Sequence, residues 1–300
     1  MLKIKQENLI KQDNRYYYDN ERFNGVIFFI KNFIIEAKKV CKDGQVVGDY
    51  INPYFDNIFT LHIDKDALEI PNPKIYRNEI PRYYKREPFT GIVYKFQNGF
   101  CIEETEYRDG IGADNIGYDG GKSYSGLCSI NYFETGIMKE FKRKDNNLLQ
   151  EFDWYENNNV KNIYIDEENS VWFGFSFTDN GQLIRLDLDW YFEEFDEIKK
   201  KIEFNILPNK KELLGISLAN KISFSGEDIK DELLKDFFEK SNLKDVNEIF
   251  FSDTSLTQKG YKILLDIPSL EKVHLRGYNL SFDVVDRLRE KGVEVKITTI

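Results

Sequence analysis

The sequence has few cysteines and histidines and no long hydrophobic run. Its 300 residues include 3 cysteines and 2 histidines. Cys41, Cys101 and Cys128 lie far apart and form no C-x-x-C pair, which argues against a zinc site and a disulfide framework. Residues 26–30, the longest apolar run near the start, cannot span a bilayer, and the first residues lack the apolar segment of a secretory signal. We therefore expect free thiols in a cytoplasmic protein without a membrane segment.

Basic charge is also in short supply. The chain carries 42 Lys and Arg against 52 Asp and Glu, which gives a net charge of −10 and a pI near 5.0. A nucleic-acid backbone or an anionic membrane surface is a poor partner for such a chain, whereas a basic protein is a natural one. Nearly all of the acidic excess lies in residues 1–206. The length and the 41% hydrophobic content predict about two globular domains.

A repeat of apolar strand, turn and apolar strand runs through the first two thirds of the chain. The clearest copies cover residues 89–104, 124–140, 148–165 and 172–188, with a weaker copy at 23–37. Their turns contain Asn98-Gly99, Thr135-Gly136, Asn158-Asn159 and Asn180-Gly181, and the aromatic residues before the last three turns are spaced by about 22 to 23 residues. Turn pairs of this kind between alternating apolar residues predict β-hairpins. One hairpin cannot bury its own apolar face, so we expect neighbouring hairpins to stack into an extended antiparallel sheet.

The order of glycine, aromatic residue and turn glycine in these copies resembles the MORN-type repeat. It is more specifically similar to the variant repeats of bacterial antitoxin and immunity proteins, over about residues 89–188 and more weakly back to residue 23. The Tyr-x-Gly start of the standard repeat is intact only at Tyr124. The resemblance implies a binding or scaffolding role and no catalytic residues. The copies that carry it are Gly91/Phe96/Gly99, Gly126/Tyr132/Gly136 and Gly174/Phe177/Gly181.

The glycine-rich stretch "DGIGADNIGYDGGKSYSG", residues 109–126, is the strongest candidate for a ligand loop. A Walker-type phosphate loop would need glycine where Ile116 stands and a helix after Lys122, and the sequence provides neither. Asp109, Asp114 and Asp119 do not have the spacing of an EF-hand. We interpret residues 110–122 as a turn-rich loop inserted between two hairpins, with weak ion binding as the alternative.

Five of the seven prolines lie between residues 50 and 88. Because proline opposes continuous helix and central strand, this segment is predicted to be a long insertion between the first repeat and the others. His62 and Asp64 could form half of a metal site, but no third ligand accompanies them. We therefore expect no metal and no cofactor.

An acidic, aromatic segment follows the last hairpin. In residues 185–204 the apolar period changes from that of a strand to that of an amphipathic helix. Its acidic and aromatic side chains would suit a basic protein partner, while a solvated helix face is the simpler alternative. A glycosidase-like pair is disfavoured because so many carboxylates give no reason to select two. The predicted partner-binding residues here are Asp189, Trp190, Tyr191, Phe192, Glu193 and Glu194.

A second repeat, of 24 residues, occupies the C-terminal part. Residues 246–269 align with 270–293, and 222–242 form a looser third copy. The strand pattern resembles a leucine-rich repeat over about residues 214–300, with Thr257 and Ser281 as natural helix N-caps and Gly292 after the last helix. In such an array the residues between the strand leucines lie on the open sheet face. We predict partner contacts for Phe250, His274 and Arg276, with ordinary surface as the alternative; no serine or cysteine elbow supports His274 as a catalytic base.

Together these patterns predict an α+β protein with a MORN-variant β-repeat domain at 1–206, carrying the insertion at 50–88, and a leucine-rich-repeat-like domain at 207–300. The expected function is non-enzymatic protein binding by an immunity or antitoxin protein that covers the active site of a cognate toxin, and the expected toxin is a basic domain. A structural scaffold that joins host proteins is the alternative, and a hydrolase with an unrecognised site is a third. No catalytic residues are assigned.

Overall fold

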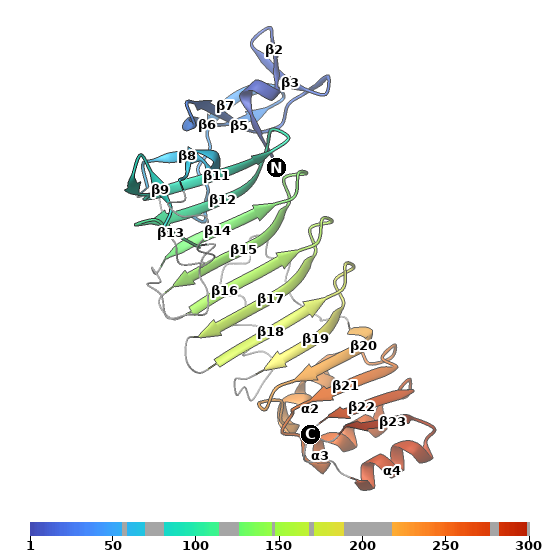
Figure 1. Ribbon diagram of the computed structural model, residues 1–300. Helices are drawn as coiled ribbons and strands as arrows, with labels where there is room; N and C mark the ends of the chain where they lie inside the picture. Colours follow the sequence, from blue (N-terminus) through green and yellow to red (C-terminus); the bar gives the residue numbers. More distant parts are fainter. Residues whose placement is uncertain are drawn as a thin grey trace. The chain divides into compact units, whose positions relative to one another are not determined.

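The computed structural model describes residues 1–55, 59–69, 81–113, 126–145, 148–167, 171–188, 218–276 and 282–298. Strands dominate these residues and helices are few, as the predicted sheet-rich fold requires (Figure 1). The chain divides into two compact units, Met1–Asn158 and Asn159–Ile300. The predicted boundary after residue 206 lies outside the described residues.

The first unit is built almost entirely of strands and two short 3-10 helices. These elements are β1 (Leu2–Lys5), η1 (Gln6–Asn8), β2 (Ile10–Gln12), β3 (Arg15–Tyr18), β4 (Glu21–Arg22), β5 (Gly25–Lys31), β6 (Ile34–Lys42), β7 (Gln45–Asp49), β8 (His62–Asp64), η2 (Lys65–Ala67), β9 (Tyr83–Tyr84), β10 (Glu87–Pro88), β11 (Gly91–Gln97), β12 (Phe100–Arg108), β13 (Ile111–Gly112), β14 (Leu127–Tyr132), β15 (Met138–Asp145) and β16 (Leu148–Trp154).

The predicted hairpins of this unit are confirmed. Strands β11 and β12 pair antiparallel around Asn98 and Gly99, whose φ angles of 52° and 84° are both left-handed. Two successive left-handed residues match the right-handed twist of the flanking strands, which explains the Asn-Gly pair. Strands β14 and β15 form the next hairpin, with Gly136 at φ 76°, and β16 pairs antiparallel with β15.

Six strands of the first unit close into a ring, which the hairpin pattern does not predict. Strand β1 pairs in parallel with β5, β5 with β6, and Ile34 of β6 lies beside Ile63 of β8. Strand β8 pairs in parallel with β11, β11 pairs with β12, and Phe100 of β12 returns to Ile4 of β1. Because each of the six strands has two partners, closure removes the exposed edges that an open sheet would keep at these strands.

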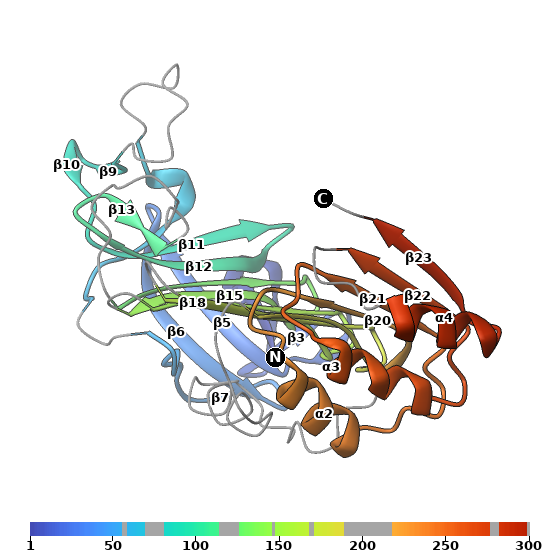
Figure 2. The same cartoon turned by 90° about the horizontal axis from the view of Figure 1, so that it is seen from below.

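The ring encloses aromatic side chains. Figure 2 shows β5 and β6, drawn in blue, crossing the teal strands β11 and β12. Between them the Phe28 ring lies 5.2 Å from Tyr94 and 5.3 Å from Phe96, both edge-on. On the opposite face of β1 and β5, Ile4 and Ile27 pack in a separate apolar cluster that includes residues of the small sheet β2–β4. The first unit therefore encloses an interior, whereas a single-layer sheet would enclose none.

The second unit combines three antiparallel strands with alternating strands and helices. Its elements are β17 (Val160–Glu167), β18 (Val171–Phe177), β19 (Leu183–Leu188), β20 (Leu218–Ser225), α2 (Asp231–Lys240), β21 (Glu248–Ser252), α3 (Gln258–Lys262), η4 (Ile263–Asp266), β22 (Lys272–Arg276), α4 (Phe282–Glu290) and β23 (Glu294–Thr298).

The C-terminal repeats form neighbouring parallel strands. Strands β20 to β23 pair in parallel in chain order, and Ile249 lies beside Val273, as the sequence alignment predicts. Helices α2 to α4 cover one face of these strands (Figure 2). The Phe224 ring meets Phe237 of α2 at 5.5 Å, and Phe251 meets Tyr261 of α3 at 5.9 Å. The helices thus bury one side of the parallel strands.

The predicted helix ends are also found. Thr257 caps α3, since its hydroxyl accepts a hydrogen bond from the Lys259 amide at 3.2 Å. Gly292 follows α4 with φ 85°, the left-handed conformation that glycine favours after a helix. Ser281 lies outside the described residues.

Several predicted segments are described only in part. Of the glycine-rich loop at 110–122, residues 110–113 are described and the rest are not. The insertion at 50–88 contributes β8, η2, β9 and β10, while 56–58 and 70–80 lie outside the described residues. The acidic segment is described as far as Leu188, the end of β19.

The cysteines, the helices and the metal-ligating side chains bear on three further predictions. Cys41, Cys101 and Cys128 are free and buried, so the prediction of free thiols is confirmed. In the described part of the chain, no helix is both long and apolar enough to cross a membrane. No group of three or more metal-ligating side chains gathers among the same residues.

Candidate protein-interaction surface

The second unit presents a polar sheet face opposite its helices. Side chains alternate across a strand, so Ile249 and Phe251 face the helices and are fully buried, while Phe250 between them faces away and is half-buried. His274 occupies the matching position of β22, and its ring lies 5.9 Å from Phe250. The repeat register thus places an aromatic ring and an imidazole side by side.

Above this pair runs a row of alternating charges. Strand register aligns Lys221, Glu248, Lys272 and Glu294 across β20 to β23. Lys221 Nζ lies 2.7 Å from a Glu248 carboxylate oxygen, and Lys272 Nζ lies 3.9 Å from Glu248 and 3.8 Å from Glu294. The Lys221 hydrogen bond, together with the charge of the lysines, lowers the pKa of Glu248. Glu248 is therefore a stable anion at the centre of the row.

Two further rows of side chains cross the same face of β20 to β23, and they contribute basic groups. His274 Nε2 lies 3.1 Å from Glu248, and Lys296 of β23 follows His274 in register. Arg276 lies in the row with Ser225 and Ser252 and is exposed. We call these three rows, on the side of β20 to β23 away from the helices, the open face. Its charged members are Lys221, Lys272, Arg276, Lys296, Glu248 and Glu294.

The charge of the open face is opposite to that of the chain. Four of its charged side chains are basic and two are acidic, whereas the whole protein has a net charge of −10. A partner that docks here meets a partly exposed aromatic ring with basic groups around it. Interfaces commonly use such an aromatic anchor surrounded by a polar rim.

The structure brings together one of the two predicted groups of contact residues. Phe250, His274 and Arg276 lie on the open face, within two adjacent strands. The other group, Asp189, Trp190, Tyr191, Phe192, Glu193 and Glu194, lies outside the described residues. Sequence reasoning did not identify Lys221 and Lys296 as members of this face. Lys221 lies 27 residues before its neighbour Glu248 and Lys296 lies 22 residues after its neighbour His274, so the 24-residue repeat does not place them.

A second polar cluster, also missed, lies inside the ring of the first unit. Lys3 is 5% exposed and forms an ion pair with Glu104, which is fully buried. The Lys3 ammonium also donates to the hydroxyls of Tyr50 at 2.8 Å and Tyr132 at 2.7 Å. The second oxygen of Glu104 accepts a hydrogen bond from the Asn52 amide at 2.8 Å. We call these five residues the buried network.

Charge pairing in the buried network outweighs the cost of burial. Burial alone would lower the pKa of Lys3 and raise that of Glu104, because it disfavours both charged forms. The opposite charges reverse both effects, so the Lys3 pKa is raised and the Glu104 pKa is lowered. Both side chains are therefore charged at neutral pH. The strand pattern gave no signal for this pair because its members are 101 residues apart.

The candidate half-site for a metal is occupied by other contacts. His62 Nε2 hydrogen-bonds to the Phe59 carbonyl at 3.2 Å, and its Nδ1 to the Tyr94 hydroxyl at 2.9 Å. Asp64 pairs with Lys5 at 3.0 Å. Both residues are thus engaged in holding β8 within the ring.

The fold and the open face define a protein of β-hairpins followed by a parallel strand and helix array. No protein-family model matches the sequence, and neither the curated proteins nor the solved structures contain a match to it.

Proposed function

We propose that the chain is a non-enzymatic protein-binding module that neutralises a protein toxin by covering its active site. The observation that carries the proposal is the open face, where Phe250 and His274 lie between rows of charged side chains on a rigid sheet. A rigid platform lowers the entropy lost on association, so such a surface favours binding. The immunity or antitoxin role is carried by the likeness of the hairpin repeats to variant MORN repeats.

Two electrostatic effects define the partner. The net charge of −10 attracts a basic protein at long range and speeds its encounter. At short range, the basic groups Lys272, Arg276 and Lys296 would meet acidic side chains near an apolar pocket that receives Phe250. The expected partner is thus basic overall, with a local acidic rim.

The test uses the product of the gene directly upstream, because immunity genes are expected to follow the genes of the toxins they neutralise. That protein is produced alone and together with this chain, and host growth is measured. The proposal expects growth arrest by the partner alone and rescue on co-expression. A partner that is harmless, or that is not bound by this chain in a purified mixture, would contradict the immunity role.

Variants locate the interface. The double variant Phe250→Ala/Arg276→Glu removes the anchor and reverses a rim charge, so we expect the dissociation constant to rise at least 100-fold, mainly through faster dissociation. Lys259→Glu is the control, because Lys259 is an exposed residue of α3 on the opposite side of the strands. Equal binding by the double variant and the control would remove the open face from the proposal.

A further inference from the structure

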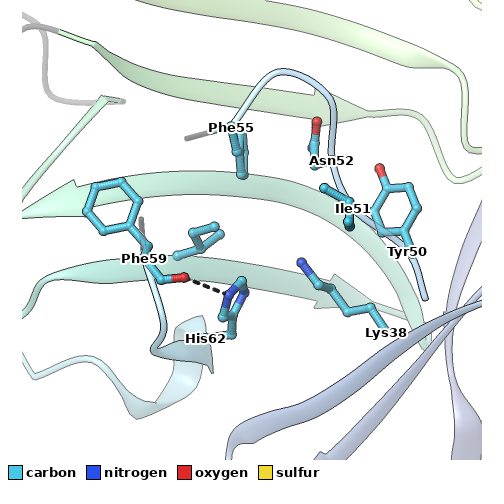
Figure 3. A pocket seen from close by; sticks show the side chains of 8 residues that line it. Lys38, Tyr50, Ile51, Asn52, Phe55, Phe59 and His62 are labelled. Carbon is cyan, nitrogen blue, oxygen red and sulfur yellow. Dashed lines mark hydrogen bonds between the residues drawn. The ribbon is translucent and has the colours of Figure 1, made fainter. Parts of the chain in front are cut away.

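A cavity of about 240 Å³ lies beside the buried network in the first unit (Figure 3). Strand β6, the segment that follows β7, and β8 supply most of its wall, and Ile92 of β11 completes it. Ile51, also in the wall, is 62% exposed, which places part of the cavity at the surface. Its other lining residues are Lys38, Tyr50, Asn52, Phe55, Phe59 and His62.

One end of the cavity is positively charged. Lys38 Nζ donates to the Tyr94 hydroxyl at 2.8 Å, and Tyr94 in turn hydrogen-bonds to His62. A carbonyl can only accept, so the Phe59 contact fixes the proton on His62 Nε2, and Nδ1 accepts from Tyr94. Burial, with the nearby charge of Lys38, lowers the pKa of His62 to about 4. Because His62 is neutral, it neither cancels the positive charge of Lys38 nor adds a charge to the cavity.

Two fully buried carboxylates, Glu104 and Glu106, lie near the cavity, but the direct hydrogen-bond partner of Lys38 is a neutral hydroxyl. Glu104 supplies one negative charge, and Lys3 pairs with it directly. Lys38 adds a second positive charge, and within the described residues no carboxylate forms an ion pair with it. Burial lowers the Lys38 pKa; the charge of Glu104 opposes this effect and the charge of Lys3 adds to it, as expected for an ammonium without a direct ionic partner. A negative charge placed at Lys38 would give this ammonium a direct ionic partner.

The rest of the cavity suits an apolar body. Phe55, Phe59 and Ile92 are all buried lining residues, and Figure 3 shows the two phenylalanine side chains on the side of the cavity away from Tyr50. A dry cavity of about 150 Å³ already holds a benzene ring, so the larger volume here accommodates a ring with a short acidic substituent. Apolar walls with a few placed polar groups are typical of small-molecule sites.

Two donors are available for the acidic group. The Lys38 ammonium has three N–H bonds, of which Tyr94 takes one. Tyr50 accepts from Lys3 through its oxygen, so its own O–H can donate, and its pKa, raised to about 12 chiefly by burial, keeps that proton in place. One ammonium without a direct ionic partner, together with two donors, matches a carboxylate better than a doubly charged phosphate.

We propose that this cavity binds a small aromatic monocarboxylate, with the carboxylate at Lys38 and Tyr50 and the ring between Phe55, Phe59 and Ile92. The site is separate from the open face and does not depend on the proposed toxin partner. It makes the first unit a ligand-binding element in its own right.

The first experiment titrates the full chain with phenylacetate, phenylacetamide and acetate by isothermal titration calorimetry. Phenylacetamide has the same shape without the charge, and acetate has the charge without the ring. We expect phenylacetate to bind at least tenfold more tightly than either. Equal affinities for phenylacetate and phenylacetamide, or no binding of phenylacetate at 10 mM, a limit of about −3 kcal/mol, would overturn the proposal.

A matched pair of variants tests the role of Lys38. Lys38→Met keeps the length of the side chain and removes the charge, so the preference for phenylacetate over phenylacetamide should disappear. Lys39→Met is the control, because Lys39 follows on the opposite face of β6 and pairs with Asp49. A preference that survives in Lys38→Met, or that is lost equally in Lys39→Met, would contradict the assignment.

Stability without ligand gives an independent readout. Removing a half-buried charge that has no direct ionic partner should leave the melting temperature of Lys38→Met equal to or above that of the wild type. A clear decrease relative to Lys39→Met would show that Lys38 already has a counter-ion within the protein. That result would remove the reason for placing a ligand carboxylate at Lys38, and with it the proposal.

Discussion

The two units keep their strands together by different means. In the first unit, six strands close on themselves and enclose an ion pair, tyrosines and a histidine. In the second, helices cover one face of the parallel strands, and the side chains between them are apolar: Phe224, Phe237, Phe251 and Tyr261 are examples. The ion pairs that Glu248 forms with Lys221 and Lys272 lie on the open face.

This contrast teaches where electrostatics controls stability. A helix layer supplies enough apolar surface to fill the space against a sheet, so charge can stay in solvent. A ring made from hairpins has strands on every side, and its interior receives whichever residues alternate inward. Once Lys3 and Glu104 are inside, each becomes indispensable to the other, since an unpaired buried charge is costly.

The largest effect is expected from the same substitution made in each unit. Glu104→Gln leaves Lys3 without its counter-charge, and we expect the first unit to lose about 3 to 5 kcal/mol of unfolding free energy. Glu248→Gln also removes a paired carboxylate, but this one lies at the surface between two lysines. The loss of unfolding free energy should therefore stay below about 1 kcal/mol. Hydrogen exchange of peptides from β12 and from β21, followed by mass spectrometry, measures both.

A double variant separates charge from packing in that experiment. Lys3→Met/Glu104→Gln removes both charges, and most of the lost stability should return. If the double variant is as unstable as Glu104→Gln alone, packing rather than charge governs the ring, and the contrast between the units fails.

A moderate effect of pH is expected in the first unit. The folded-state pKa of His62 is lowered to about 4, while an unfolded histidine titrates near 6.5. Between these values the unfolded state binds more protons, so stability falls as the pH falls, by at most about 2 kcal/mol from pH 7 to pH 5. Urea unfolding of the wild type and of His62→Gln at several pH values measures the slope, which the variant should lose.

The control for this prediction is the other histidine of the chain. His274→Gln changes a residue of the open face and leaves His62 in place, so it should retain the slope of the wild type. Loss of the slope in His274→Gln instead would assign the pH dependence to the second unit.

The smallest effect is expected at Asp231, a buried carboxylate of the second unit that accepts hydrogen bonds from uncharged groups. Asp231 accepts hydrogen bonds from the Thr257 amide at 2.8 Å and from its hydroxyl. Thr257→Ala loses the hydroxyl and the helix cap, so we expect a loss of about 1 kcal/mol. Thr257→Ser keeps both contacts and should lose little. Faster exchange of α3 amides in the alanine variant alone would confirm the role, whereas equal exchange in both variants would refute it.

How far the fold could be predicted depended on the range of the interactions involved. The Asn98-Gly99 turn, the Thr257 cap and the alignment of Ile249 with Val273 follow from local chemistry or from a repeat, and each was predicted. The closed ring depends on contacts such as Ile4 with Phe100 and Ile34 with Ile63, which no local pattern encodes. The cavity depends on the ring and was missed with it.

The candidate sites divide in the same way. Phe250, His274 and Arg276 could be placed on one face from period and register alone, because parallel repeats bring equivalent residues side by side. His62 attracted notice as a possible ligand, but only its contacts with Tyr94 and Phe59 showed that it is neutral and structural.

The sequence by itself determined the hairpins, the 24-residue array and the side of it that carries Phe250, His274 and Arg276, because turn chemistry and alternation act over a few residues. Only the tertiary structure decided that Lys3 meets Glu104, that Lys38 lacks a carboxylate partner within the described chain, and that a cavity lies beside them. These features arise where distant strands close on one another, and their energies depend on burial, which no single segment fixes.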